Sequence, residues 1–371
     1  MIELHDFVKV LTEKKVNFFT GVPDSLLKDF CAYITDNLND ESHVISSNEG
    51  SAVALAIGHY LATESIPLIY MQNSGIGNAI NPLLSLASRE VYGIPMVLFI
   101  GWRGEPGVKD EPQHVHQGRI TEQLLEVMDI PYVVLNSDTQ LAVRQTAEYI
   151  DLAAETHGPV AILIRKGTFQ EYKLPISKDL QYELTREKAI KTLAEQIDEY
   201  TVIVATTGMA SRELFDHRVL SGQGHDQDFL TVGGMGHANQ IALGIAKANK
   251  KVCCFDGDGA ILMHMGSMAI IGQSNLKNMT HIVLNNGTHD SVGGQPTIAR
   301  SIKLTDIALS CGYDKAVSVA SESELIRIIR EHNNSESIFV EINVKPGNRP
   351  DIGRPTTSPE ENKKLLMRRL K

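Results

Sequence analysis

The sequence has few cysteines, and none is spaced for a disulfide framework or a zinc site. Its 371 residues contain four cysteines without a CxxC pair, and two of them are adjacent in an apolar stretch. Small disulfide-rich or zinc-binding domains need more cysteines at short, regular spacing. The pattern therefore argues against both classes and predicts a protein of a reducing compartment, the cytoplasm. The four are Cys31, Cys253, Cys254 and Cys311.

The sequence also lacks the long apolar runs and the basic excess that membrane and nucleic-acid partners require. No apolar run reaches the roughly 20 residues of a membrane span. The first stretch, MIELHDFVKVLTEKK, is charged and amphipathic, so we expect neither a signal peptide nor an anchor. The formal net charge is −10, whereas nucleic-acid binding needs a basic face. We therefore expect a soluble cytoplasmic protein that binds neither membrane nor nucleic acid.

Short apolar stretches alternate with helical segments along the chain, which is typical of α/β folds with parallel sheets. A polar segment, residues 169–189, separates two such series. We predict two similar parallel-sheet domains, residues 1–170 and 171–371. The expected strands lie in residues 17–23, 43–48, 67–75, 95–104, 132–136 and 159–167, and then in 200–208, 228–234, 251–259, 281–287 and 337–344.

The two halves repeat one pattern of loop, helix, strand, glycine-ended loop, helix and strand. SSNEGSAVALAIGHYLA opens the series in the first half, and VGGMGHANQIALGIAKA opens it in the second. Chance similarity is the alternative, because such units are common. Matched parallel sheets would bind ligands at the carboxyl ends of their strands. Small residues expected to let the two helices lie close to the sheets are Ala54, Ala56, Gly58, Ala242, Gly244 and Ala246.

Polar side chains in glycine-rich loops follow two of the expected strands in the second half. One strand ends in GDG around Asp258, and the next ends in the pair Asn285 and Asn286. A carboxylate and an amide oxygen from neighbouring strand ends suit Mg²⁺, with the Thr288 carbonyl as a third ligand. The GDG glycines and the helix that follows would offer backbone N–H groups to a diphosphate. The alternative is an ordinary strand-to-helix turn at GDG. The loop with Asn285 and Asn286 at the end of the next strand makes this alternative less favoured.

The GDG loop followed by an asparagine pair resembles the motif of thiamine diphosphate-dependent 2-oxo acid decarboxylases. The resemblance covers nearly the whole chain and is closest to phosphonopyruvate decarboxylases, with sulfopyruvate decarboxylases next. Larger members carry a middle domain, for which this chain has no room. The stretches that carry the resemblance are SSNEGSAVALAIGHYLAT, MQNSGIGNAINPLLSLAS, DEPQHVHQGRIT, TTGMASREL and NNGTHDSVGGQPT.

The resemblance implies that the second half anchors thiamine diphosphate. Asp258, the Asn286 side chain and the Thr288 carbonyl would bind Mg²⁺. Met235 would prop the cofactor in its bent shape, and the carbonyl of Gly233 would accept a hydrogen bond from its amino group. Further cofactor contacts are implied for Thr207, Ser211, Gly257, Gly259 and Ala260.

The first half would supply the proton chemistry. By resemblance, Glu49 hydrogen-bonds a nitrogen of the aminopyrimidine ring, and burial among apolar neighbours would raise its pKa. The alternative is a helix-terminal glutamate stabilised by the dipole. Ser25 and Asn73 match loops that face the reacting carbon. His114 and His116 would act from one side of an extended polar loop, with surface histidines or a metal pair as alternatives. Other candidate histidines are His237, His264 and His289.

One loop departs from the family pattern. His289 and Asp290 stand where many relatives have tyrosine and glycine. No role at His289 or Asp290 therefore carries over from those relatives.

The implied reaction converts 3-phosphonopyruvate to phosphonoacetaldehyde and CO₂ in phosphonate biosynthesis, in a homo-oligomer with the site between subunits. Alternatives are sulfopyruvate decarboxylation, a carboligase with the same cofactor, and a non-catalytic subunit. The last should lack Glu49 or a metal ligand, and this chain has both. A phosphonate needs cations or N–H donors. Candidates, each of which could equally be an ordinary surface group, are Arg103, Lys109, Arg119, Arg300, Gly293 and Gly294.

Overall fold

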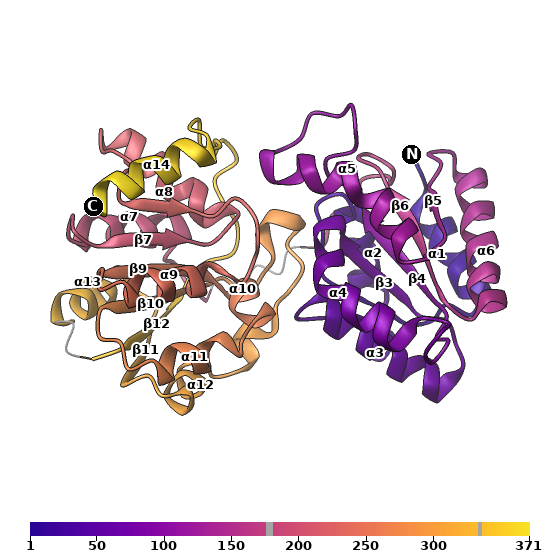
Figure 1. Ribbon diagram of the computed structural model, residues 1–371, viewed down its shortest axis with the longest axis horizontal. Coiled ribbons are helices and arrows are strands. Elements are labelled where there is room, and N and C mark those ends of the chain that lie inside the picture. Colours follow the sequence, from indigo (N-terminus) through magenta and orange to yellow (C-terminus); the bar gives the residue numbers. More distant parts are fainter. Residues whose placement is uncertain (176–180, 333–335) are drawn as a thin grey trace. The chain divides into compact units, whose positions relative to one another are not determined.

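The chain forms two compact units, each a parallel sheet covered by helices on both faces (Figure 1). The computed structural model describes residues 1–175, 181–332 and 336–371. The units are Met1–Ile176 and Ser177–Lys371. Part of the polar segment expected between the domains, residues 176–180, lies outside the described residues.

The first unit contains a six-stranded sheet in the order β2-β1-β3-β4-β6-β5. All of its strand pairs are parallel. The strands are β1 (Phe19–Gly21), β2 (His43–Ile45), β3 (Leu68–Gln72), β4 (Met96–Gly101), β5 (Tyr132–Val134) and β6 (Pro159–Ile164).

The second unit contains a six-stranded sheet in the order β11-β12-β10-β9-β7-β8, again parallel throughout. Numbered within their own unit, both sets of strands follow the order 2-1-3-4-6-5. The predicted repetition of one unit is therefore present in the topology. The strands are β7 (Val202–Ala205), β8 (Asp228–Leu230), β9 (Val252–Gly257), β10 (Met279–Asn285), β11 (Lys315–Val319) and β12 (Ile338–Asn343).

Two apolar layers sandwich the first sheet because its side chains alternate between faces. On β4, Val97 and Phe99 pack towards α1, α2 and α6, whereas Met96, Leu98 and Ile100 pack towards α3, α4 and α5. The helices are α1 (Leu4–Glu13), α2 (Lys28–Asn37), α3 (Glu49–Thr63), α4 (Ile76–Pro82), α5 (Pro112–Val127) and α6 (Thr139–Thr156), with short turns Asn73–Gly75 and Leu83–Ala87.

The second sheet is covered in the same way. Helices α7, α8 and α13 share one core, and α9 to α12 and α14 share the other. The helices are α7 (Arg186–Gln196), α8 (Met209–Leu220), α9 (Ala238–Lys247), α10 (Asp258–Met263), α11 (Ser267–Gln273), α12 (Leu304–Cys311), α13 (Glu322–Glu331) and α14 (Pro359–Arg369), with short turns Asp290–Val292 and Ile298–Ser301.

Two details of the sequence prediction are wrong. Strand β11 was not expected, because KAVSV is only partly buried at a sheet edge and has no long apolar run. On the small-residue helices, Ala56, Ala242 and Ala246 are buried, but the other three positions face solvent and cannot mediate close packing: Ala54, Gly58 and Gly244.

In the part of the chain that the structure describes, no helix has both the length and the apolar character needed to cross a membrane.

Candidate active site

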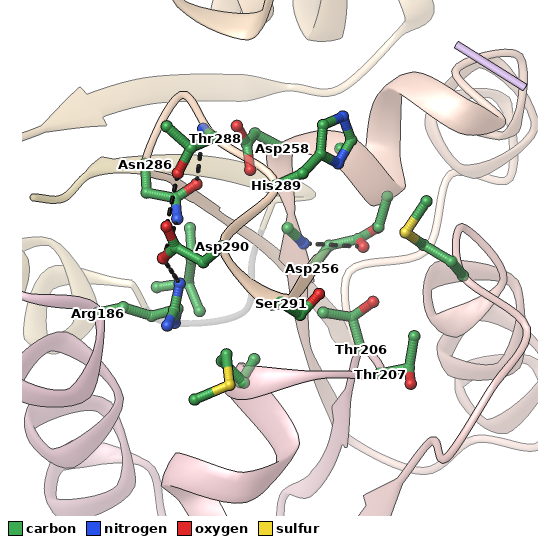
Figure 2. Close-up of a pocket in the computed structure, with 17 residues that line it drawn as sticks. Arg186, Thr206, Thr207, Asp256, Asp258, Asn286, Thr288, His289, Asp290 and Ser291 are labelled. Carbon is green, nitrogen blue, oxygen red and sulfur yellow. Dashed lines mark hydrogen bonds and ion pairs between the residues drawn. The ribbon is translucent and has the colours of Figure 1, made fainter. Parts of the chain in front are cut away.

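The GDG and NNG loops leave the second sheet side by side. Strands β9 and β10 are paired in parallel with Gly257 opposite Leu284, so both end at the same edge. The loops border a pocket of about 520 Å³ that is open to solvent (Figure 2). The pocket thus lies at the carboxyl edge of the sheet, where α/β folds bind ligands.

Most of the cofactor residues expected in this unit line the pocket. Ser211 and Gly233 do not. The Ser211 hydroxyl is buried and donates to the Thr206 carbonyl at 2.7 Å, so it ties the end of β7 to α8. The expected residues in the lining are Thr207, Met235, Gly257, Asp258, Gly259, Ala260, Asn286 and Thr288.

Asp258 begins α10 and has the character of a cation ligand. Its carboxylate is 4% exposed and accepts hydrogen bonds from the Thr297 hydroxyl at 2.6 Å and from the Gly259 backbone N–H, both neutral groups. Burial raises the pKa of Asp258 to about 6, and the nearby Asp290 adds to the rise. A divalent cation beside this carboxylate would offset the cost of burying its charge.

Asn286 rather than Asn285 faces the pocket. The Asn286 side chain donates from Nδ2 to Asp290 at 2.6 Å, and its Oδ1 accepts from the Thr288 backbone N–H at 3.2 Å. The Asn285 amide is buried, with Nδ2 donating to Glu341 at 2.8 Å and Oδ1 accepting a backbone N–H. The asparagine pair therefore divides into one structural residue and one that can present its oxygen to a ligand.

A buried ion-pair network under the NNG loop was not predicted. The Arg186 guanidinium forms two hydrogen bonds to Glu213, at 2.9 and 3.0 Å, and a third to Asp290 at 2.8 Å. Arg186 and Asp290 are 104 positions apart, and no spacing rule in the sequence connects them. The network joins α7 and α8 to the loop that follows β10.

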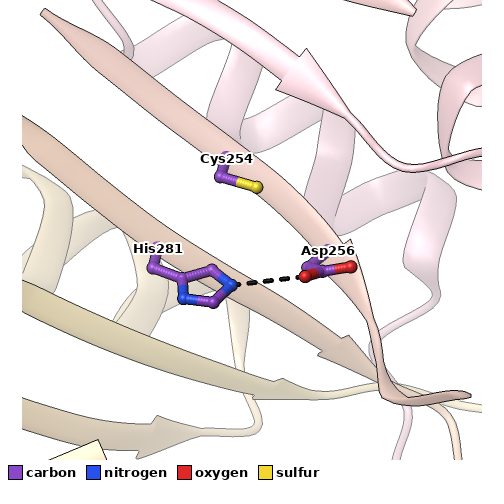
Figure 3. A group of neighbouring side chains, drawn as sticks. All are labelled: Cys254, Asp256 and His281. Atoms are coloured by element: carbon purple, nitrogen blue, oxygen red, sulfur yellow. Dashed lines mark hydrogen bonds and ion pairs between the residues drawn. The ribbon is translucent and has the colours of Figure 1, made fainter. Parts of the chain in front are cut away.

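A second unpredicted cluster lies deeper in the sheet (Figure 3). Potential metal-binding atoms of Cys254, Asp256 and His281 lie within 4.8 Å of one another. Hydrogen bonds explain the cluster better than a metal. Asp256 accepts from Asn239 at 2.8 Å and from the next backbone N–H, and His281 lies 2.7 Å from the Tyr313 hydroxyl. Burial also raises the pKa of the Cys254 thiol well above its usual range, which disfavours a thiolate ligand. The cluster fixes the end of β9, just before Asp258.

His289 contacts the GDG loop directly and lines the pocket. A Cβ atom at Gly259 would lie 2.6 Å from the His289 ring, so this glycine is required for the approach. Burial lowers the pKa of His289 to about 4. His289 is therefore a neutral imidazole at physiological pH.

In the first unit, Glu49 is a buried carboxylate at the start of α3. Asn48 caps the helix by accepting from the Ser51 backbone N–H at 2.9 Å, and Glu49, the first residue of the helix, is only 5% exposed. Its Oε2 accepts from Asn78 at 2.8 Å. A Cβ atom at Gly75 would lie 2.3 Å from its Oε1, so only glycine leaves room for the carboxylate. Burial raises the pKa of Glu49, and the bond from Asn78 only partly opposes this.

Ser25 and Asn73 lie at the same carboxyl edge of the first sheet, joined through Arg103. Asn73 donates to the Arg103 carbonyl at 2.8 Å and to Thr121 at 2.9 Å, and Arg103 donates from Nη1 to the Ser25 hydroxyl at 2.8 Å. Arg103 also forms a two-pronged ion pair with Asp110. The Asn73 side chain is therefore engaged in holding this network.

The prediction of an extended loop around His114 and His116 is wrong, because Pro112 starts helix α5 there. Residues two apart on a helix point in different directions. His114 is accordingly buried, whereas His116 is exposed and bonded to Arg119 at 2.7 Å. The stretch contains both buried and exposed polar residues of a helix, and a polar composition alone is equally typical of a loop.

The remaining phosphonate candidates are dispersed. Lys109, Gly293 and Gly294 are exposed. Arg300 donates to the Val344 carbonyl at 2.8 Å and lies over the Tyr182 ring. The structure does not gather these groups into one anion site within either unit.

The chain is similar to known proteins over nearly its whole length. Residues 4–125 match the family described as "Thiamine pyrophosphate enzyme, N-terminal TPP binding domain", and residues 206–342 match its "C-terminal TPP binding domain". The phosphonopyruvate decarboxylase of Streptomyces viridochromogenes is 33% identical over 97% of this chain and 93% of its own. The chain belongs to the phosphonopyruvate decarboxylase family.

Two further relatives match the chain over nearly its whole length. The phosphonopyruvate decarboxylase of Streptomyces hygroscopicus is 32% identical over 97% of this chain and 92% of its own. A sulfopyruvate decarboxylase from Methanosarcina acetivorans is 27% identical over 95% of this chain and 94% of its own. The sequence resemblance is confirmed, as is the prediction of two similar α/β domains without a middle domain.

The burial of Glu49 should make the stability of the folded protein depend on pH. Because the pKa of Glu49 is raised above its ordinary value of 4.5, the folded protein loses stability as the pH rises from 4.5 through the raised value. A pKa raised by one corresponds to about 1.4 kcal/mol. We expect Glu49→Gln to raise the unfolding temperature of the cofactor-free protein, more at about pH 8 than at about pH 5.

The measurement is thermal unfolding after chelator treatment at the two pH values. Glu64→Gln, at the exposed end of the same helix, is the matched control and should give no pH-dependent gain. An equal gain for Glu49→Gln at both pH values would contradict a raised pKa at Glu49.

Proposed function

We propose that this chain decarboxylates 3-phosphonopyruvate to phosphonoacetaldehyde and CO₂, with thiamine diphosphate and Mg²⁺, in phosphonate biosynthesis. The observation that carries the proposal is the pairing of two features on a chain of this family. One is the buried oxygen set of Asp258 and Asn286 beside an open pocket, and the other is the buried Glu49. The full-length similarity to two phosphonopyruvate decarboxylases supports the choice of substrate.

The second unit fits a metal–diphosphate pair. Asp258, the Asn286 side-chain oxygen and the Thr288 carbonyl would bind Mg²⁺, which prefers oxygen ligands and shares its shell with phosphates. The neutral hydrogen bonds to Asp258 leave its negative charge for the cation. Met235 lines the same pocket and would support the cofactor by apolar contact.

The first unit would control the protons. Thiamine diphosphate, when bound, supplies the electron-accepting ring that allows a 2-oxo acid to lose CO₂. Glu49 would share a proton with a ring nitrogen of the aminopyrimidine, and its raised pKa suits a group that alternates between the two protonation states. Ser25, and a histidine from among those predicted, would complete the site around the reacting carbon. His114 and His116 remain candidates on α5.

Sulfopyruvate is the second candidate substrate, because a sulfopyruvate decarboxylase also matches the chain over its full length. Its lower identity, 27% against 33%, favours phosphonopyruvate. Two further functions are compatible with this fold: a carboligase with the same cofactor, and a non-catalytic subunit. The chain keeps Glu49 together with Asp258 and Asn286, the proposed metal ligands, which argues against the non-catalytic subunit.

The substrate assignment predicts a pattern of CO₂ release. We expect release from 3-phosphonopyruvate only when both thiamine diphosphate and Mg²⁺ are present, and much slower release from 3-sulfopyruvate and pyruvate. The assay measures CO₂ from all three acids with and without each cofactor. Faster release from sulfopyruvate would retain the site and change the substrate. No release from any acid would favour a carboligase or a silent subunit.

Glu49 should matter for turnover and not for cofactor binding. We expect Glu49→Gln to lower turnover roughly 10²–10⁴-fold, the range for losing a positioned acid–base group. The dissociation constant of thiamine diphosphate in the presence of Mg²⁺, measured by calorimetry, should change only a few-fold, because in this proposal the other unit holds the diphosphate. Glu64→Gln on the same helix should leave both quantities unchanged. Near-normal turnover in Glu49→Gln would exclude the proposed proton relay.

We also propose that the protein is a cytoplasmic homo-oligomer with its active site between subunits. The four cysteines are free, which accords with a reducing compartment. We expect sedimentation at assay concentrations to give at least a dimer, with activity confined to that species. An active monomer would rule out a shared site.

A further inference from the structure

The loop that follows β10 is closed on itself above the pocket. The Thr297 backbone N–H donates to the Gly287 carbonyl at 2.9 Å, and the His289 backbone N–H donates to the Gln295 carbonyl at 2.8 Å. Residues 287–297 therefore form a compact loop with a fixed base. Something must still fix the side chains within it, because a closed backbone leaves the side-chain torsions free.

Asp290 is the residue to which the loop's side chains are bonded (Figure 2). Its Oδ2 accepts from Asn286 Nδ2 at 2.6 Å and from Arg186 Nη1 at 2.8 Å. Its Oδ1 accepts from the Thr288 hydroxyl at 2.7 Å. The Gly347 backbone N–H lies 3.1 Å from both oxygens. These four donors surround a carboxylate whose side chain is only 8% exposed.

The orientation of Asn286 follows from this contact. A carboxylate only accepts hydrogen bonds, so the amide must turn its nitrogen towards Asp290 and its oxygen away. The oxygen is the atom that a hard cation binds. Without Asp290 the amide would keep the longer 3.2 Å bond from the Thr288 backbone N–H to its oxygen but would lose the 2.6 Å bond that holds its nitrogen, so it could rotate and place the nitrogen at the ligand position.

Asp290 is itself held by the protein framework. Arg186 binds it with one edge of the guanidinium while Glu213 accepts two bonds from the rest of the group. Arg186 lies on α7 and Glu213 on α8, two helices that pack together. The ion pairs therefore fix the position of the loop relative to helices α7 and α8.

We propose that Asp290 is a positioning residue for the Mg²⁺ site: it orients Asn286 and Thr288 and anchors them through Arg186 to α7 and α8. The inference rests on the metal role proposed above. Asp290 acts through its neighbours, because the donors around its two oxygens already engage it. Outer partners of this kind typically contribute 10–100-fold to metal affinity.

The test measures metal affinity directly, apart from turnover. Mn²⁺ replaces Mg²⁺ as a probe, and electron paramagnetic resonance counts free Mn²⁺ in the presence of saturating thiamine diphosphate. We expect Asp290→Ala to raise the Mn²⁺ dissociation constant about 10–100-fold. Asp290→Asn, which keeps the shape and one acceptor oxygen, should raise it by less and serves if the alanine variant does not fold.

Asp228→Asn is the matched control. Asp228 forms a fully buried, two-pronged ion pair with Arg218 in the same unit, with both bonds at 3.0 Å, and it lies outside the pocket lining. We expect it to lower the unfolding temperature as the Asp290 variants do, and to change Mn²⁺ affinity less than about twofold.

Two results separate this inference from the proposed function. If the wild-type protein binds Mn²⁺ with thiamine diphosphate and both Asp290 variants bind it equally well, the positioning role is wrong and the metal site stands. If the wild-type protein shows no cofactor-dependent Mn²⁺ binding, the metal role itself fails. An equal loss of affinity in Asp228→Asn would reduce Asp290 to a general stability role and overturn the inference.

Discussion

The second unit is organised by the need to bury several carboxylates at one edge of a sheet. Charges removed from water must be paired or hydrogen-bonded, or the fold loses stability. Glu213 and Asp290 share Arg186, and Asp256 is satisfied by hydrogen-bond donors around it. Asp258 differs, because the donors that the structure describes at its carboxylate are neutral, and burial raises its pKa to about 6. Charge left uncompensated at this point makes the pocket suited to a cation, and the surrounding network keeps the neighbouring loops in place.

The first unit handles its buried acid differently. Glu49 receives a hydrogen bond from a neutral amide, Asn78, and lies against the backbone at Gly75. Desolvation therefore raises the pKa of Glu49, and no cation in its described contacts pulls it back. One unit thus buries a carboxylate whose charge has neutral neighbours, and the other buries a carboxylate whose raised pKa favours the protonated form. Both arise from burial at strand ends with few charged partners.

The architecture could be predicted because it depends on local patterns. Apolar strands, glycine-ended loops and the repeated order of helices and strands are visible in the sequence. Among the strands that the structure describes, the partly buried edge strand β11 was the one not predicted. Asp258, Asn286 and Glu49 were also accessible, because motif and resemblance point to them. Arg186, Asp256 and Thr297 were not, since their partners lie far away in sequence and only folding brings them together. The extended loop predicted around His114 and His116 is wrong for a local reason, because a polar helix start beginning with Pro112 has the composition of a loop.

The shared strand order 2-1-3-4-6-5 allows the two units to be compared place by place. The connection after the second strand leads to Glu49 in one unit and passes Met235 in the other. The connection after the third strand carries Asn73 in one and Asp258 in the other. After the second strand, an acid in one unit corresponds to an apolar side chain in the other. After the third strand, an amide corresponds to an acid. The two units therefore share one topology but carry different functional side chains at equivalent strand ends.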